Sequence, residues 1–274
     1  MKKTSFILLV LLFTACTTIE ITEQDAFDNH ATISPEALRY DQYTLQQRNI
    51  ETEDGEILNS WFLERPDAQA TVIYFGGNGF LMVKSRPLIS AYSDIPVNLI
   101  LFDYRGYGVS TGSPSVQGVH TDAEAIFNET ITRFGGENHP VYLHGHSMGA
   151  FLAAYLAEQH TVAGYILESP ITEVRGWTRK FVPWVLRPFV RFDIDLNIAE
   201  QNNLERVSQI EHPLLIIGGT YDNVTPLWMA EEIYNASTSP EKELVKIAGG
   251  THNDLAQFPI YQSRIRDFLL NDID

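Results

Sequence analysis

Residues 145–149 read Gly-His-Ser-Met-Gly and fit the pattern G-x-S-x-G, in which one serine stands between two glycines. An apolar run, Val141–His144, comes directly before this pentapeptide, and an alanine-rich stretch, Ala150–Ala157, directly follows it. A sharp turn from a strand into a helix strains the serine backbone, so the neighbouring positions need glycine. We therefore predict that Ser147 is a nucleophile. The alternative is a glycine-rich turn whose serine only caps the helix.

A serine hydroxyl attacks efficiently only when a base accepts its proton, and histidine commonly takes that role. We predict that His252 is the base, because it lies in a loop between the last predicted strand and the last predicted helix. An exposed loop histidine without a role is the alternative. Of the other seven histidines, His30 lies in the N-terminal segment, and His120, His139 and His160 lie at element edges. His212 precedes a strand. His144 and His146 lie too close beside the serine to reach it from the correct side.

The base in turn needs a carboxylate that fixes its tautomer and stabilises its charged form. Asp222 follows the apolar run Leu214–Ile217 and is the predicted acid. The resulting chain order of serine, aspartate and histidine differs from the orders in chymotrypsin and subtilisin. Glu168, at the end of the preceding strand, is the alternative acid, whereas Asp254 is expected only to cap the final loop or helix.

The oxyanion that forms when serine attacks a carbonyl group must be stabilised by hydrogen-bond donors. We predict that one donor is the backbone N–H of Met148, directly after the nucleophile. The other is assigned to the backbone N–H of Asn78, within the glycine-rich loop Gly-Gly-Asn-Gly at residues 76–79. A glycine loop that serves only to reverse the chain is compatible with the same position.

Two β-type runs, Tyr43–Glu51 and Ile57–Glu64, flank the turn pair Asp54-Gly55 and predict a hairpin. Further on, short apolar runs typical of buried parallel strands alternate with amphipathic stretches typical of helices. The predicted strands are Thr71–Phe75, Val97–Phe102, Val141–His144, Gly164–Leu167, Leu214–Ile217 and Leu244–Ile247. The predicted helices are Val83–Tyr92, Gln117–Arg133, Met148–Gln159, Pro226–Asn235 and Pro259–Leu270. This order predicts an α/β-hydrolase fold, a mostly parallel central sheet with an N-terminal antiparallel hairpin and helices on both faces.

The chain resembles the small α/β-hydrolase-domain serine hydrolases, a branch that includes protein depalmitoylases and many bacterial esterases. The resemblance runs from about Thr71 to Phe268 and rests on the Gly-His-Ser-Met-Gly segment, the segments around Asp222 and His252, and Asp-Tyr-Arg-Gly-Tyr-Gly at residues 103–108. It implies cleavage of a carboxylic ester or thioester through an acyl-enzyme, with Asp103 and Arg105 bracing a turn. Members of this branch usually have a histidine at the position of Gly76, and that histidine shapes the oxyanion loop. We therefore expect the loop geometry of this chain to differ from that of the branch.

The segment between Ser169 and His212 shows no strand pattern and is predicted to form a small cap, at residues 170–212, over the carboxyl ends of the strands. Residues 174–192 combine five aromatic and five basic residues without any acid. Trp177, Phe181 and Trp184 are expected to roof the substrate pocket and to favour acyl or otherwise hydrophobic esters. This composition also suits contact with anionic lipid headgroups. Simple packing of the cap over the sheet is the equal alternative.

The N-terminus predicts export. Met1-Lys2-Lys3 supplies positive charge, and the apolar run Phe6–Phe13 is too short to span a bilayer comfortably, so residues 1–15 are interpreted as a signal peptide. Phe-Thr-Ala-Cys at residues 13–16 resembles the lipobox of bacterial lipoproteins, which implies lipid attachment at Cys16. Residues 16–40 are then a tether and 41–274 the hydrolase domain. Thr17 in place of aspartate implies an outer-membrane lipoprotein facing the periplasm.

The formal net charge of -16 excludes nucleic acid as a partner, because a phosphate backbone binds a basic surface. The single cysteine excludes an internal disulfide and a cysteine-based metal cluster. We expect no cofactor, a monomer, and a small or lipid-like ester as substrate. A serine peptidase or amidase using the same residues is one alternative. A binding lipoprotein that retains the fold without catalysis is another.

Overall fold

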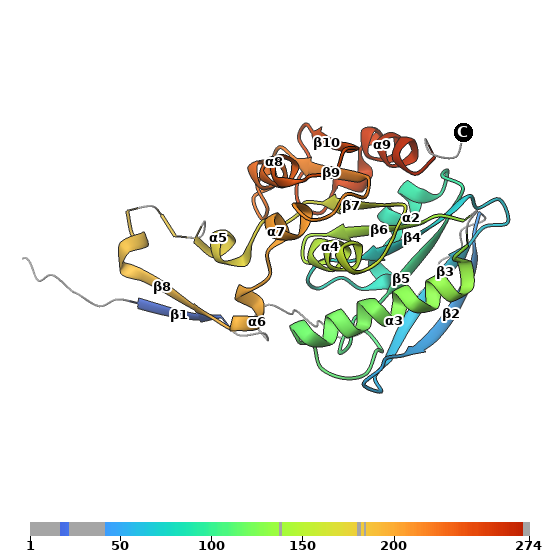
Figure 1. Ribbon diagram of the computed structural model, residues 1–274, viewed down its shortest axis with the longest axis horizontal. Helices are drawn as coiled ribbons and strands as arrows, with labels where there is room; N and C mark the ends of the chain where they lie inside the picture. The colour runs from blue at the N-terminus through green and yellow to red at the C-terminus, as the bar shows by residue number, and fades with distance from the viewer. Residues whose placement is uncertain (1–16, 22–41, 137–138, 180–181, 184, 271–274) are drawn as a thin grey trace, which may run out of the picture.

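The computed structural model describes residues 17–21, 42–136, 139–179, 182–183 and 185–270 of the chain. In this part of the chain, eight strands form one sheet in the order β10-β9-β7-β6-β4-β5-β3-β2 (Figure 1). The strands from β10 to β5 in that order are parallel, whereas β3 pairs antiparallel with both β5 and β2. The strands are β2 Thr44–Glu51, β3 Ile57–Glu64, β4 Ala70–Phe75, β5 Val97–Phe102, β6 Val141–His146, β7 Gly164–Glu168, β9 Leu214–Gly219 and β10 Lys242–Ile247.

Helices cover both faces of this sheet and bury a hydrophobic core on each. Helices α3, α4, α7 and α8 pack on one face, and α2 and α9 pack on the other. The strands between the two layers are mainly apolar and are buried along their whole length, since both faces are covered. The helices are α2 Arg86–Tyr92, α3 Val116–Phe134, α4 Gly149–Gln159, α7 Asn203–Val207, α8 Leu227–Ala236 and α9 Pro259–Leu270, with short 3₁₀ turns η1 Met82–Lys84 and η3 Leu255–Gln257.

The predicted α/β-hydrolase architecture is confirmed, with the antiparallel hairpin at the edge of the sheet and the parallel strands beside it. One predicted helix is divided. The expected helix Val83–Tyr92 consists of η1, a break at Ser85 and then α2. Pro87 lies in the first turn of α2, where its missing N–H costs no hydrogen bond, so α2 begins only at Arg86.

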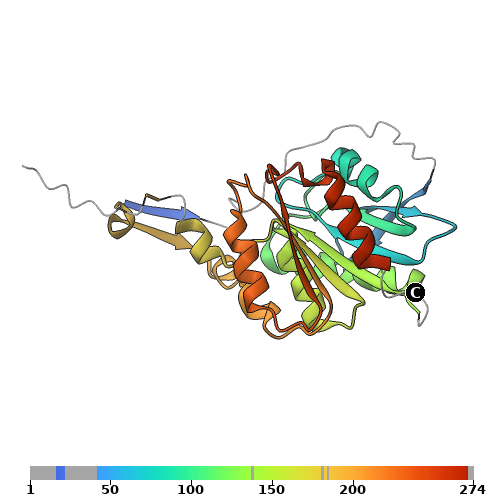
Figure 2. The same ribbon diagram turned by 90° about the horizontal axis from the view of Figure 1, so that it is seen from above.

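The cap contains a strand that the sequence did not predict. Helix α5 Val174–Arg179, the turn η2 Arg187–Phe189, strand β8 Val190–Ile194 and helix α6 Leu196–Ala199 project from the sheet (Figure 2). Strand β8 pairs in parallel with β1 Thr17–Ile21, so the predicted tether begins with a strand. Along β8 half-buried and exposed residues alternate, which is the period of a strand. The pattern was missed because it is short and its partner lies far away in the sequence.

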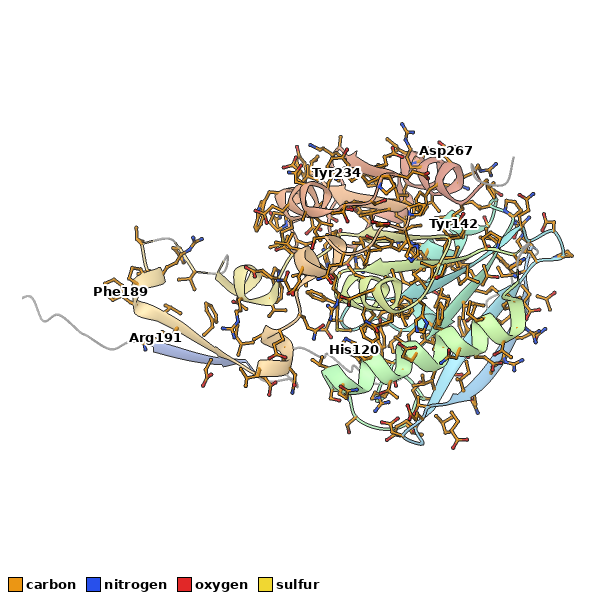
Figure 3. All side chains as sticks on the ribbon, in the orientation of Figure 1. His120, Tyr142, Phe189, Arg191, Tyr234 and Asp267 are labelled. Atoms are coloured by element: carbon orange, nitrogen blue, oxygen red, sulfur yellow. The ribbon has the colours of Figure 1, made fainter. Side chains whose placement is uncertain are left out.

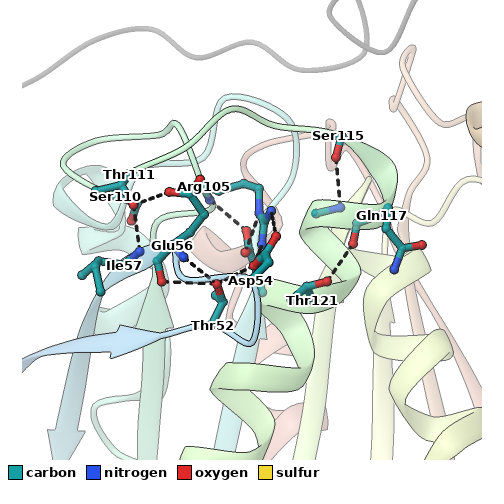
Figure 4. Close-up of polar contacts among 12 residues, drawn as sticks. Thr52, Asp54, Glu56, Ile57, Arg105, Ser110, Thr111, Ser115, Gln117 and Thr121 are labelled. Carbon is teal, nitrogen blue, oxygen red and sulfur yellow. Dashed lines mark hydrogen bonds and ion pairs between the residues drawn. The ribbon is translucent and has the colours of Figure 1, made fainter.

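A buried arginine after β5 forms ion pairs with the hairpin and with α3. Both terminal nitrogens of Arg105 donate hydrogen bonds to Asp54 in the hairpin turn (Figure 4). Its Nε donates to Asp122 on α3. Its backbone N–H also donates to Asp122, at 2.9 Å. Burial raises the pKa of Asp122 to about 6, although the hydrogen bonds and positive charge of Arg105 oppose that rise. Arg105 therefore braces the turn, as the sequence predicts.

Replacing Arg105 with methionine should lower the free energy of unfolding by about 3 to 5 kcal/mol, because it leaves a buried carboxylate unpaired. The side chains of Arg105 and Asp122 are only 7% and 0% exposed. A matched control is Arg133→Met, since Arg133 forms a more exposed ion pair with Glu64 and should contribute about 1 kcal/mol or less. Urea unfolding of both variants measures the difference. Equal losses would contradict the bracing role.

Candidate active site

Ser147 lies on a strained turn between β6 and α4. Its φ is +53°, a left-handed conformation that residues other than glycine rarely adopt. Gly149 allows the turn to approach the end of β4, because a Cβ at this position would overlap the carbonyl oxygen of Phe75. The backbone N–H of Ser147 donates to the carbonyl of Glu168 at the end of β7, at 2.9 Å. The serine side chain is thus held above the carboxyl ends of the central strands, where open α/β sheets bind ligands.

The three predicted catalytic side chains form one continuous hydrogen-bonded chain. The hydroxyl of Ser147 and His252 Nε2 are 3.0 Å apart, and His252 Nδ1 donates to Asp222 Oδ2 at 2.8 Å. The three residues come from the loops after β6, β9 and β10. The first and the last of them, Ser147 and His252, are 105 positions apart in the sequence. The geometry suits a base that accepts the serine proton and an acid that fixes the tautomer of the base.

Asp222 is prepared for the ionised state. Its Oδ1 accepts hydrogen bonds from the backbone N–H groups of Val224 and Thr225, at 2.8 and 2.7 Å. The hydroxyl of Thr225 donates to Oδ2 at 2.8 Å, beside the bond from His252. Burial opposes ionisation, yet these hydrogen bonds and the His252 ring lower the pKa of Asp222 to about 2. The carboxylate therefore keeps its negative charge throughout the neutral pH range.

Glu168, the alternative acid, lies in a different network. Its Oε2 accepts hydrogen bonds from His144 Nε2 at 3.1 Å and from the hydroxyl of Tyr261 at 2.9 Å. On the other side of the ring, the hydroxyl of Tyr92 donates to His144 Nδ1, at 2.7 Å. Burial works against ionisation, but hydrogen bonds from His144 and Tyr261 and the neighbouring histidine rings lower the pKa of Glu168. This carboxylate contacts His144 beneath the serine turn and makes no hydrogen bond to His252.

Two residues that support His252 were not recognised in the sequence. His146 Nε2 donates to the backbone carbonyl of His252 at 2.9 Å and so holds the loop that carries it. Burial lowers the pKa of His146, which keeps the ring neutral for this role. The hydroxyl oxygen of Thr225 lies 3.1 Å from His252 Nδ1, and the same hydroxyl donates a hydrogen bond to Asp222. Its signal in the sequence was an aspartate three residues before a threonine, a spacing typical of side-chain capped turns.

The loop after β4 approaches the serine closely. A Cβ at residue 77 would lie only 3.1 Å from the Cβ of Ser147, so Gly77 lets the loop approach the serine without crowding it. Asn78 and Met148 line the same cavity as Ser147, which is compatible with both backbone N–H groups facing a substrate carbonyl. Gly76 faces the ring of Phe80, which occupies the space that a side chain at position 76 would need. This is the position at which the branch that the chain resembles usually has a histidine.

The Asp-Tyr-Arg-Gly-Tyr-Gly segment braces this loop, a function that the sequence did not indicate. The hydroxyl of Tyr104 donates to the carbonyl of Gly76 at 2.9 Å, and that of Tyr107 donates to Asn78 Oδ1 at 3.0 Å. Asp103 accepts a hydrogen bond from the backbone N–H of Met82, at 2.8 Å, just beyond the loop. These contacts hold residues 76–79 in place without the histidine that is usual in the branch of hydrolases that the chain resembles.

A cavity of about 500 Å³ opens over Ser147 and His252. Its walls are mainly apolar and come from α3, α4 and the cap: Val116, Val119, Phe151, Leu152, Ile171, Val174 and Ile198. His120, labelled in Figure 3 near the first turns of α3, and Gln201 add polar groups to the wall. Burial and the positive charge of Arg206 lower the pKa of His120 to about 4, so its ring is neutral at neutral pH. The described lining contains no aspartate and no glutamate.

Of the predicted cap residues, Trp177 lines this cavity, and its indole N–H donates to the carbonyl of Val224 at 2.9 Å. Because the N–H of Val224 donates a hydrogen bond to Asp222, this contact connects the cap to the loop that carries Asp222. Phe181, Trp184 and Cys16 lie outside the described residues, as do the predicted signal peptide and most of the tether. Among the described helices, none is both long and apolar enough to cross a membrane.

Comparison with known proteins identifies the family. The family model described as serine aminopeptidase, S33, matches residues 66–208, just over half of the chain. An uncharacterized protein of Mycobacterium tuberculosis is 30% identical over 224 residues, covering 80% of this chain and 77% of the relative. The uncharacterized protein YfhR of Salmonella typhi is 31% identical over 238 residues, with coverages of 80% and 78%.

Solved structures show the same fold. An esterase of Pyrococcus furiosus superposes with a TM-score of 0.68 at 22% identity, covering 85% of this chain and 92% of the esterase. A thermophilic esterase of Thermogutta terrifontis has a TM-score of 0.63 at 18% identity, with coverages of 82% and 98%. Together with the hydrogen-bonded serine, histidine and aspartate, the matches show that the chain belongs to the serine aminopeptidase S33 family of α/β-hydrolases.

Proposed function

We propose that this hydrolase cleaves carboxylic esters or thioesters that carry an apolar acyl group, through an acyl-enzyme on Ser147. The observation that supports this most directly is the hydrogen-bonded chain from Ser147 through His252 to Asp222, placed at the base of a largely apolar cavity. An apolar pocket that holds a few convergent polar groups is typical of small-molecule sites. Acyl transfer is the reaction that this set of groups performs.

In the proposed reaction, the Ser147 hydroxyl oxygen attacks the ester carbonyl carbon while its proton moves to His252 Nε2. The backbone N–H groups of Met148 and Asn78 stabilise the oxyanion. When the intermediate collapses, the C–O or C–S bond breaks and the leaving alcohol or thiol takes the proton from His252. Water then attacks the acyl carbon while His252 takes its proton. The bond from that carbon to the Ser147 oxygen breaks, the serine takes the proton from His252, and the carboxylic acid is released. Asp222 keeps His252 in the required tautomer throughout.

An aminopeptidase activity, which the family description suggests, is the second candidate. Recognition of a substrate's free amino terminus requires a carboxylate near the reacting serine, because a buried ammonium group needs a paired charge. The described walls of the cavity offer none. The apolar lining instead matches an acyl chain, so the ester function is the better supported of the two.

We also propose that the protein is an exported lipoprotein, with residues 1–15 removed and a lipid on Cys16, in the outer membrane facing the periplasm. The support is the charged start, the apolar run at residues 6–13 and a cysteine at the end of it. Stable anchoring requires more than one acyl chain, as bacterial lipoproteins carry. A soluble or membrane-borne acyl ester would then meet the enzyme outside the cytoplasm.

Ser147→Ala should reduce ester hydrolysis by about 10⁴-fold to 10⁶-fold, because it removes the nucleophile while leaving the base and the oxyanion donors in place. Hydrolysis of a p-nitrophenyl ester and labelling by a fluorophosphonate probe both measure the effect. Ser169→Ala is the matched control, since Ser169 is also buried with a positive φ but lies outside the cavity lining. A Ser147→Ala protein with a tenth of the parental activity would contradict the assignment.

The choice of acid can be tested by replacing each candidate. Asp222→Asn should reduce turnover by roughly 10⁴-fold, because an amide favours the wrong tautomer of His252. Glu168→Gln should lower turnover far less, since Glu168 bonds His144 and Tyr261 instead of the base. Turnover numbers with one ester at saturating concentration make the comparison. The reverse ranking would assign the acid to Glu168.

The acyl specificity should depend on Val116, which is half-buried in the cavity wall. Val116→Phe fills part of the cavity, so kcat/KM for long-chain esters should fall about tenfold relative to that for acetate esters. Val109→Phe is the control, because Val109 is 68% exposed and lies outside the cavity. An equal loss for all chain lengths would mean that the acyl group binds elsewhere.

A further inference from the structure

The cap extends away from the sheet, and its outer end is formed by two segments that are far apart in the sequence. Strand β8 runs from this end back toward the sheet, and β1 lies parallel beside it (Figures 1 and 2). Thr17 is opposite Val190, and Ile21 is opposite Ile194. The first residue of β1 is therefore at the outer end of the cap, next to the turn η2.

Residues 185–189 form the outer end of the cap, the cap tip. It exposes large apolar side chains to solvent: Val185 is 51%, Leu186 is 49% and Phe189 is 58% exposed. Figure 3 shows Phe189 at the far end of the projection, away from the body of the molecule. Several exposed apolar side chains within five residues form a patch, and such patches mark interaction surfaces.

Arginines lie within this apolar tip and directly behind it. Arg175, Arg187 and Arg191 line one cavity of about 430 Å³, whose remaining walls include Val182, Val190 and Phe192. None of the three arginines forms an ion pair with any acid in the described part of the chain. In a chain of net charge -16, this cluster is a local reversal of charge that would attract an anionic surface.

We propose that the cap tip docks on a bilayer of anionic phospholipids, with Val185, Leu186 and Phe189 among the acyl chains and the arginines on the headgroup phosphates. Apolar residues at the end and basic residues behind them match the order of layers in a membrane surface. The position of β1 favours a bilayer over a protein partner. Cys16 directly precedes Thr17, and consecutive Cα atoms are about 3.8 Å apart, so a lipid on Cys16 would emerge at the tip.

This docking would deliver substrate to the catalytic cavity, a step that rests on the proposed function. Helix α5 separates the two cavities: Trp177 lines the catalytic one, Arg175 lines the arginine-rich one, and Thr178 contributes to both. The arginine-rich cavity thus lies one short helix away from the cavity over Ser147. We expect membrane-borne acyl esters to be hydrolysed better by the docked enzyme than by an undocked variant.

The test uses the full lipidated chain reconstituted into vesicles of phosphatidylethanolamine and phosphatidylglycerol. Because Cys16 is the single cysteine and would carry the lipid, Leu186→Cys introduces one free thiol for an environment-sensitive fluorophore. The label should gain intensity and shift to the blue in these vesicles. The same label at Ser263→Cys, on an exposed position of α9, should stay in water and show no change.

A charge variant separates docking from simple anchoring. Arg187→Gln with Arg191→Gln should lower the docked-to-undocked ratio about tenfold at low salt, and high salt should reproduce this loss. The control removes two charges outside the cap, Lys84→Gln with Arg264→Gln, and should change nothing. A label at 186 that remains in water, a shift at both labelled sites, or a shift that develops without lipid would each overturn the proposal.

Hydrolysis of a water-soluble ester, measured on every variant, keeps the two proposals distinguishable. The tip and charge variants should retain the parental rate on that ester while losing rate on vesicle-borne esters. If no variant and no parental protein cleaves the soluble ester, the enzymatic proposal fails, but the fluorescence of the label still decides whether the cap tip docks. If the charge variant keeps its full rate on vesicle-borne esters, docking does not deliver the substrate.

Discussion

The left-handed backbone at Ser147 constrains the rest of the site. With a φ of +53° the serine lies at the apex of a turn that only close packing can maintain. Gly149 must be glycine because a Cβ there would overlap the end of β4, and Gly77 lets the loop after β4 pack closely against Ser147 itself. Three segments thus meet at one point, and Ser147, His252 and the glycine loop at residues 76–79 are all positioned relative to that point.

Around this turn, hydrogen bonds from distant elements hold His252 and Asp222. His146 fixes the backbone of His252, Thr225 bonds Asp222, and Trp177 of the cap bonds the carbonyl of Val224 in the acid loop. Beneath the turn, Glu168 and His144 form a second polar network that includes a tyrosine from each helix of one face, Tyr92 and Tyr261. Buried polar groups that are fully bonded in this way rigidify the surrounding structure. The proposed catalysis depends on that rigidity, because the base must stay within hydrogen-bond distance of the serine.

The sequence predicted the parts of the molecule that follow from local patterns. Continuous apolar runs predicted the buried strands, and the glycines around Ser147 predicted the strained turn. Parts that depend on pairing between distant segments could not be predicted. Strand β8 gains its partner from residues 17–21, and the tyrosines at 104 and 107 contact a loop almost thirty positions earlier. The supporting roles of His146 and Thr225 were missed because they depend on where the loop of His252 lies in space.

The most direct test of the proposed enzymatic function is to trap the acyl-enzyme. The protein would be mixed with an activated acyl ester, quenched rapidly in acid, and analysed by intact-mass and peptide mass spectrometry. The account predicts a mass increase of one acyl group, located on the peptide that contains Ser147 and lost on further incubation as water releases the acid. Rapid ester cleavage without any adduct, or an adduct on another residue, would contradict the assignment of Ser147 as the nucleophile.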